Sequence, residues 1–377
     1  MLINKCLSII CFLPVAYFFA DYAHAFTDSE DLRRKEAISL MAAGEYDAAK
    51  EILEEMSKKG LSSALVRNEQ QKLLGQVQLR LEDYNGAIAS FTNVIDFPRA
   101  ERTTALINRC YAYLQLNLLL DAQRDCSEGR HIIERVNLTN LSKDTSEGTQ
   151  AFRQISLSMV EAEIFVNLGQ PEQALEVLYS SREIVEDANL EIKNYWGLLL
   201  SIAEISSSIG QYKNSLKILD EIEHIIPNTE RHRLLAARAS TLRGMGDVDG
   251  AVTNWTDAYN ASLEVGHHAE TNIGYLFLAC AHLIQEGRNE DALSPCNAAA
   301  EANPKSALYA EANAFAITQA YGLSAGAKEI NRATQLSLNS PIRAFVAQKL
   351  FEQIPSVTGI IENLYDLTSL EVESNQP

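Results

Sequence analysis

Apolar residues recur at helical spacing in two short runs between residues 70 and 98, with a polar turn between the runs. In the second run, Ala87, Phe91 and Val94 follow one another at steps of three and four, which places them on one face of a helix. Pro98 ends this run because its ring cannot continue a helix. The pattern predicts two short helices joined by a tight turn.

The same arrangement returns along the chain. The predicted turns are anchored at Gly44, Glu82, Asn117, Gly169, Gly210, Gly246, Gly287 and, in a degenerate last copy, about Tyr321. Most anchors lie about 34 to 41 residues apart, which suits two helices of about four turns each with short links. One longer step contains the polar stretch Val136–Gln150, which we expect to be a loop.

These features resemble the tetratricopeptide repeat family. The resemblance rests on Leu74-Gly75 in the first helix, Tyr84 and Ala87 in the turn, Phe91 four residues on and Pro98 near the end, with Glu82 where the family has glycine. It implies an all-α fold, a right-handed superhelical solenoid of about eight helix pairs. Pro341 introduces an amphipathic stretch without a partner turn, which we expect to be a C-terminal capping helix.

Three segments follow from this pattern. Residues 1–25 have a positive start at Lys5, an apolar run and the small-x-small sequence Ala23-His24-Ala25, which predicts a signal peptide cleaved before Phe26. The alternative, an uncleaved anchor, fits less well because the apolar run ends at Asp21 and is shorter than the roughly 20 residues that span a bilayer. Residues 26–340 form the predicted solenoid, and residues 341–377 the capping helix and a flexible tail.

The predicted export and the net charge limit where the protein is located and which partners it can bind. The signal peptide predicts a periplasmic protein, with secretion as the alternative. The formal net charge of -18 disfavours nucleic acid and anionic lipid as partners of the average surface. No further apolar run is long enough to cross a membrane once the signal is removed.

Motifs of catalysis are missing from the sequence. No HExxH, Gly-x-Ser-x-Gly or glycine-rich phosphate loop occurs. We therefore expect no catalytic residues, no cofactor, no metal and no enzymatic activity.

Four cysteines remain after the predicted cleavage, and they share one placement. Cys110 and Cys126 lie seven residues before and nine after Asn117, and Cys280 and Cys296 lie at the same offsets from Gly287. Positions nearly equidistant from a turn face each other in an antiparallel helix pair, so both pairs are candidate disulfides. Four buried free thiols are the alternative.

The family resemblance also implies a partner-binding groove on the first helices. Its positions fall on Arg34, Lys72, Gln76, Arg80, Tyr111, Gln115, Glu163, Asn167, Glu204, Arg233, Arg243, Phe277, Gln285 and Phe315. Some members of the family clamp a C-terminal carboxylate. Lys72, Gln76 and Asn108 resemble part of that clamp, but Ser156 and Val160 stand where its two further cations belong.

The sequence thus predicts an exported scaffold or adaptor that binds another protein or an extended peptide segment, in the context of cell-envelope assembly. Isolated cations in the groove favour a segment with some negative charge. The alternative is a glycan-binding or regulatory subunit of an envelope polysaccharide or secretion system. The sequence does not indicate an oligomeric state.

Overall fold

The computed structural model describes residues 27–58, 61, 63–95, 99–137, 146–187, 195–266 and 272–338. These residues form sixteen α-helices and one short 3-10 helix, and they contain no β-strand. None of the described helices is both long and apolar enough to cross a membrane. The predicted signal peptide and the predicted C-terminal cap and tail lie outside the described residues.

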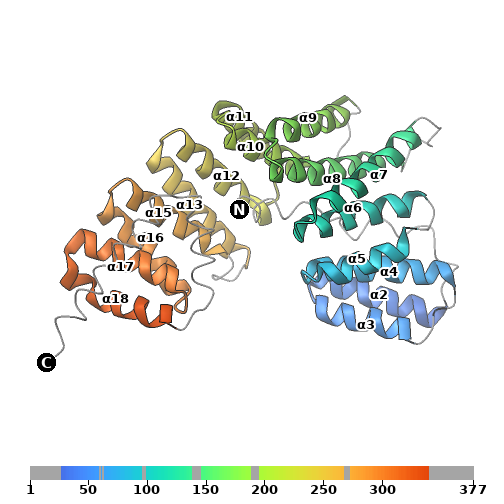
Figure 1. The fold of residues 1–377 in the computed structure, drawn as a ribbon, viewed down its shortest axis with the longest axis horizontal. Coiled ribbons are helices and arrows are strands. Elements are labelled where there is room, and N and C mark those ends of the chain that lie inside the picture. The colour runs from blue at the N-terminus through green and yellow to red at the C-terminus, as the bar shows by residue number, and fades with distance from the viewer. Residues whose placement is uncertain are drawn as a thin grey trace. The chain divides into compact units, whose positions relative to one another are not determined.

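The contacts divide the chain into two compact units, and the boundary falls between Leu198 and Leu199, inside α10 (Tyr195–Ser208). The helices of the N-terminal unit follow one another as helix pairs (Figure 1). They are α2 (Asp28–Ala43) with α3 (Tyr46–Lys58), α4 (Ala64–Arg80) with α5 (Tyr84–Val94), α6 (Arg99–Gln115) with α7 (Leu119–Asn137), and α8 (Ser146–Asn167) with α9 (Pro171–Asp187).

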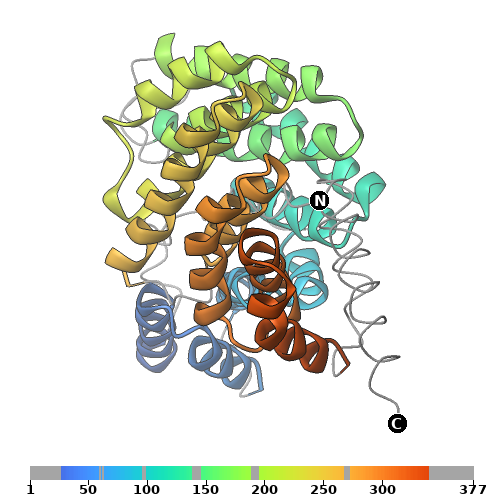
Figure 2. The same ribbon diagram turned by 90° about the vertical axis from the view of Figure 1, so that its left-hand side faces the viewer.

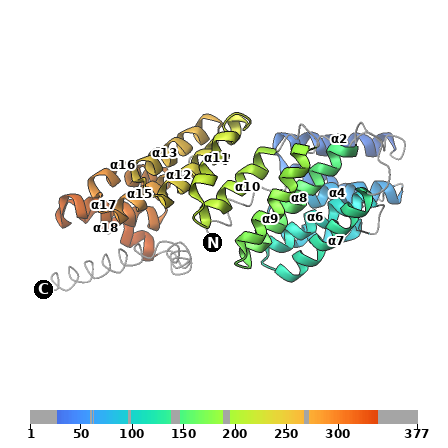
Figure 3. The same cartoon turned by 90° about the horizontal axis from the view of Figure 1, so that it is seen from above.

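The C-terminal unit repeats this plan. After α10 come α11 (Tyr212–Ile222), the 3-10 turn η2 (Asn228–Glu230), α12 (Arg231–Gly244) with α13 (Val248–Glu264), α15 (Gly274–Gln285) with α16 (Asn289–Ala302), and α17 (Ala307–Tyr321) with α18 (Leu323–Leu338). Figure 3 shows α12, α13, α15 and α16 side by side in chain order, and the neighbouring helices are in contact. Figure 2 shows the last two pairs from another side.

Seven predicted turn anchors have left-handed backbone geometry. The φ angle is positive at Gly44, Glu82, Asn117, Gly169, Gly210, Gly246 and Gly287, between 57° and 82°. This region suits glycine because a Cβ there approaches the following carbonyl oxygen. Turn geometry thus explains why glycine marks five of the seven positions.

Two of the turns also carry a helix cap. Asp83 accepts a hydrogen bond from the backbone N–H of Gly86, and Asp247 accepts one from that of Gly250, both over 3.0 Å. A carboxylate at this place satisfies one of the backbone donors that the first turn of a helix leaves unpaired.

A buried residue pair recurs at the centre of each helix pair. One member lies on the first helix and the other sixteen residues later on the second. The pairs are Ala37 with Leu53, Gly75 with Phe91, Cys110 with Cys126, Ala162 with Leu178, Ala203 with Leu219, Ala239 with Trp255, Cys280 with Cys296, and Ala314 with Ile330. Except in the two cysteine pairs, one residue is small and the other is large. In four of these pairs the two residues belong to one core or approach each other closely, namely Ala37 with Leu53, Gly75 with Phe91, Ala239 with Trp255, and Ala314 with Ile330.

The second pair shows how tight this packing is. A Cβ added at Gly75 would lie 2.7 Å from the ring of Phe91, closer than carbon atoms can approach. The aromatic side chain therefore occupies the space that a larger residue at position 75 would need.

The polar insertion differs in part from the predicted loop. Residues 136–137 continue α7, and residues 146–150 already belong to α8. Helix propagation adds one hydrogen bond per residue, so the two long helices extend into the polar stretch from both ends. Residues 138–145 lie outside the described residues.

Candidate functional site

The predicted groove residues of the N-terminal unit include three that lie among tyrosines. The guanidinium of Arg80, on α4, lies 5.7 Å from the ring centre of Tyr46. Burial lowers the pKa of Arg80, and the nearby Tyr46 and Tyr111 act against this shift. Burial also shifts the pKa of Tyr84, in this case upward, and the negative charges of Glu82 and Glu163 raise this pKa further. Arg80, Tyr111 and Glu163 thus belong to one set of neighbouring side chains from α4, α6 and α8.

Three cations of the predicted groove have carboxylate neighbours three residues earlier in the chain. Arg34 forms an ion pair with Asp31 at 3.0 Å, and Lys72 forms one with Glu69 at 2.5 Å. In the C-terminal unit, Arg233 lies 3.6 Å from Glu230. Three of the five predicted groove cations therefore have a carboxylate partner in the chain, and these three attract an acidic partner less than isolated cations would.

The predicted groove residues also differ in exposure. The buried ones are Lys72, Tyr111, Glu163 and Phe277. The half-buried ones are Arg34, Gln76, Arg80, Gln115, Asn167, Glu204, Arg233 and Phe315, and the exposed ones are Arg243 and Gln285. Alanine at Lys72 or Tyr111 would therefore disturb packing, whereas the sequence had suggested that these were surface positions.

The clamp positions are no better exposed. Asn108, Ser156 and Val160 are all buried, with at most 4% of their surface accessible. Their burial adds to the sequence departure at Ser156 and Val160, and neither feature favours capture of a carboxylate.

The half-buried Glu204 of the C-terminal unit has a shifted pKa. Burial raises the pKa of Glu204, on α10, to about 7, and the positive charge of Arg233 opposes the shift only in part. Farther along this unit, the rings of Phe277 and Tyr309 lie 5.3 Å apart. Phe315 packs beside the cores of the last two helix pairs.

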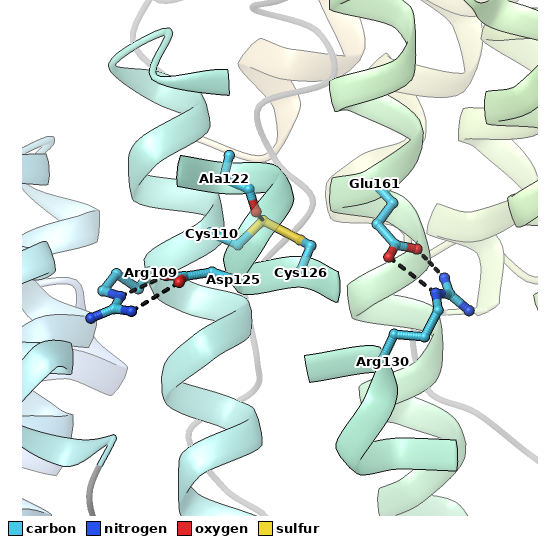
Figure 4. The surroundings of a disulfide bond; sticks show 7 residues. All are labelled: Arg109, Cys110, Ala122, Asp125, Cys126, Arg130 and Glu161. Carbon is cyan, nitrogen blue, oxygen red and sulfur yellow. Dashed lines mark hydrogen bonds and ion pairs between the residues drawn. A yellow bond between two sulfur atoms is a disulfide. The ribbon is translucent and has the colours of Figure 1, made fainter. Parts of the chain in front are cut away.

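The structure brings both predicted cysteine pairs to disulfide geometry. The Cα atoms are 5.7 Å apart in Cys110–Cys126 and 4.9 Å apart in Cys280–Cys296, within the range that a disulfide spans. Each bond joins the two helices of one pair, and Figure 4 shows the first of them between α6 and α7.

Two ion pairs near the first disulfide were not predicted. Arg109 donates to both carboxylate oxygens of Asp125, at 2.6 and 2.8 Å, and Asp125 is almost fully buried. Arg130, on α7, pairs in the same two-pronged way with Glu161 on α8 (Figure 4). The first pair has a sequence signal, since Arg109 and Asp125 each neighbour a cysteine of the bonded pair. The Lys72–Glu69 and Arg34–Asp31 pairs have one too, in their spacing of three residues.

The described residues hold no group of three or more His, Cys, Asp and Glu side chains that is arranged to bind a metal ion. Their charged groups form ion pairs within and between helices. The accessible predicted groove positions are mostly polar, and polar side chains suit binding by hydrogen bonds.

No protein-family model and no curated protein sequence matches the chain. Solved structures do match. A STAND protein with a tetratricopeptide repeat sensor, PH0952 from Pyrococcus horikoshii, gives a TM-score of 0.60 at 13% identity, over 85% of this chain and 48% of its own. A Rap protein complexed with Competence and Sporulation Factor gives 0.53 at 11% identity, over 92% of this chain and 99% of its own.

A chain of the APC/C hetero-tetramer Cut9-Hcn1 gives a TM-score of 0.51 at 12% identity, over 85% of this chain and 55% of its own. This chain therefore spans about half the length of two of these proteins and nearly all of the Rap protein. The helix pairs, the turn geometry and these similarities agree that the chain has the tetratricopeptide repeat fold.

Proposed function

We propose that this protein is an exported, non-catalytic scaffold that binds a protein partner through the first helices of its repeats, and that it serves in cell-envelope assembly. Similar structures support the first part of the proposal. The Rap protein is complexed with Competence and Sporulation Factor, and Cut9-Hcn1 is a hetero-tetramer. The predicted signal peptide and the two cysteine pairs support export.

The observation that carries the proposal is the make-up of the accessible groove positions. Gln76, Gln115 and Gln285 are half-buried or exposed, whereas Arg34 and Lys72 pair with carboxylates of the same chain. A side-chain amide both donates and accepts hydrogen bonds, so it suits the backbone of an extended segment. We therefore propose a largely neutral segment as the ligand.

The test uses substitutions that leave the buried residues in place. Gln76→Ala with Gln115→Ala changes the N-terminal unit, and Arg243→Ala with Gln285→Ala changes the C-terminal unit. The exposed Glu51 of α3, a second helix, supplies the control Glu51→Ala. Proteins captured from an envelope fraction by the wild-type chain would be identified by mass spectrometry, and their binding to each variant would then be measured.

We expect at least one groove variant to lose a partner that both the wild type and Glu51→Ala retain. If the wild type, both groove variants and Glu51→Ala capture the partner equally, the groove is not the binding site. Binding of envelope glycan that depends on the groove would favour the alternative, a glycan-binding or regulatory subunit. That alternative has less support, because Phe277 is buried and packs against Tyr309 rather than lying open for stacking on a sugar.

A further inference from the structure

The turn between α6 and α7 presents two leucines to solvent. Leu118 is 45% exposed and Leu120 is 83% exposed. Leu119, between them, packs against the core of this helix pair. The core therefore takes one of three consecutive leucines and leaves the other two outside.

Six of the other predicted turns differ from this one. The last turn, at Gly322, has another backbone geometry (φ 89°, ψ 167°) and carries Leu323 and Ala325 at the two positions. In each of the six other predicted turns with a left-handed anchor among the described residues, the two positions are polar or charged. They hold Glu45 and Asp47, Asp83 and Asn85, Gln170 and Glu172, Gln211 and Lys213, Asp247 and Asp249, and Arg288 and Glu290. The leucines are thus a local exception and not a property of the repeat.

The first leucine gives up a possible helix cap. Leu118 stands where Asp83 and Asp247 cap their helices, and leucine has no acceptor with which to do so, although Gln211 and Arg288 at the same place form no cap either. The preceding Asn117 has a φ of 59°, a region that glycine adopts without strain. A sequence that breaks local rules without a gain in packing points to a function at that place.

The surroundings of the turn indicate what would bind there. The turn of the next helix pair adds Leu168, which is 44% exposed. Glu82 and Glu172 are exposed on the neighbouring turns, and Asp121 lies beside Leu120. Asp121 is paired with Arg124 of the same helix at 2.8 Å, so the negative charge of this surface comes from Glu82 and Glu172.

We propose that Leu118, Leu120 and Leu168, here called the leucine edge, form a docking surface for a basic amphipathic segment of a protein partner. The leucines would pack against its apolar side chains, and the carboxylates would pair with its Lys and Arg. A bilayer fits poorly, because the same carboxylates and the net charge of -18 repel anionic lipid. This surface lies on the turns and not on the predicted groove positions, so it is independent of the proposed function.

The test replaces the two leucines by the residues of the sixth turn, Leu118→Asp with Leu120→Asp, in the full mature chain. The control is Leu32→Asp, which changes another leucine, 67% exposed, on α2. The probe is a labelled amphipathic helix of Leu and Lys, about 18 residues or five turns long. A peptide with Ser for Leu and one with Glu for Lys test the two kinds of contact at about 0.15 M salt.

We expect the double variant to melt no lower than the wild type, since it regains a cap, and to bind the Leu/Lys helix at least about tenfold more weakly. Its added negative charge would by itself strengthen binding of a basic helix, so the loss would be due to the leucines. Leu32→Asp should bind like the wild type, and both altered peptides should bind more weakly than the Leu/Lys helix.

Three results would overturn the proposal. One is equal affinity of the wild type and the double variant for the Leu/Lys helix. Another is that the peptide with Glu in place of Lys binds as tightly as the Leu/Lys helix, which would mean that the carboxylates do not contribute to binding. The third is that the leucines bind a different partner. The wild type would then bind vesicles of phosphatidylcholine and phosphatidylglycerol, or form dimers detected by sedimentation, and the double variant would lose that binding.

Discussion

At the scale of the residue, two turns of the described part of the chain hold a non-glycine residue in left-handed backbone geometry. Glu82 and Asn117 hold φ angles of 57° and 59° where the other five anchors are glycine. A side chain in this region costs roughly 1–2 kcal/mol, and glutamate lacks the tolerance that asparagine has for it.

We predict that Glu82→Gly raises the free energy of unfolding by about 0.5–1 kcal/mol, after the greater flexibility of glycine in the unfolded chain is subtracted. Urea unfolding would measure the change. Glu82→Ala is the control, because it removes the carboxylate but keeps the Cβ. If alanine stabilises as much as glycine, the gain comes from charge and not from the backbone.

Glu204 gives a pH-dependent prediction. Its pKa is raised to about 7 in the folded protein and is near 4.5 when the group is free, so the folded state holds the proton more tightly. Stability then falls as pH rises from about 4.5 to 7, where the unfolded chain has released this proton and the folded chain still holds it. Above pH 7 the penalty is complete.

Glu204→Gln removes this titration while keeping the size and polarity of the side chain. We expect the variant to be more stable than the wild type at pH 8, by on the order of 1–3 kcal/mol, and about equally stable near pH 4.5. Denaturant unfolding at both pH values would test this. A difference that is the same at both pH values would mean that the carboxyl does not titrate as the structure indicates.

At the scale of the helix pair, the disulfides replace a packing contact. The other six pairs have a small residue and a large one at the same two positions. Cys110→Ala with Cys126→Leu, and the equivalent change at Cys280 and Cys296, would copy the combination of Ala37 and Leu53, which belong to one core.

We predict that each double change lowers stability by about 3 kcal/mol relative to the oxidised protein, as expected for a loop of about 15 residues. Under reducing conditions the variant should match or exceed the wild type, because the core remains filled. Mass spectrometry after unfolding and alkylation without reductant reports the oxidation state of the native protein. Four alkylated cysteines in the exported chain would show that the thiols are free.

The Arg109–Asp125 pair acts at the same scale, between α6 and α7. Burial lowers the pKa of Arg109, but the hydrogen bonds and negative charge of Asp125 outweigh it, and the net pKa is raised. Asp125→Ala would leave a partly buried cation without its main partner. We expect a loss of roughly 3–5 kcal/mol by thermal or urea unfolding. Asp121→Ala on the same helix is the control; this side chain is 41% exposed, and the change should alter stability by about 0.5 kcal/mol or less.

At the scale of the whole molecule, the proposed export yields one chemical prediction. The protein recovered from its native compartment should begin at Phe26, because Ala23-His24-Ala25 fits the cleavage signal. N-terminal sequencing or intact mass would show this directly. A recovered chain that still carries residues 1–25 would contradict cleavage and favour the anchor.

The sequence was informative wherever structure is determined locally. The anchors at Glu82 and Asn117 could be found without glycine, because the spacing of the flanking apolar residues located the turns. Accessibility depends instead on which neighbouring helices cover a side chain. The periodic pattern therefore did not reveal that Lys72 and Tyr111 are buried, and Glu69 was overlooked because it lies outside the groove positions.

The recurring buried pair, sixteen residues apart, has a consequence for the history of the chain. Alanine with leucine, glycine with phenylalanine and cysteine with cysteine all occupy this place, so it tolerates exchange of the two residues together. During evolution, a disulfide could be gained or lost at this pair of positions in one repeat at a time, while each intermediate sequence still folds. The two disulfides could then occur in other repeats, and the fold does not require them at their present positions.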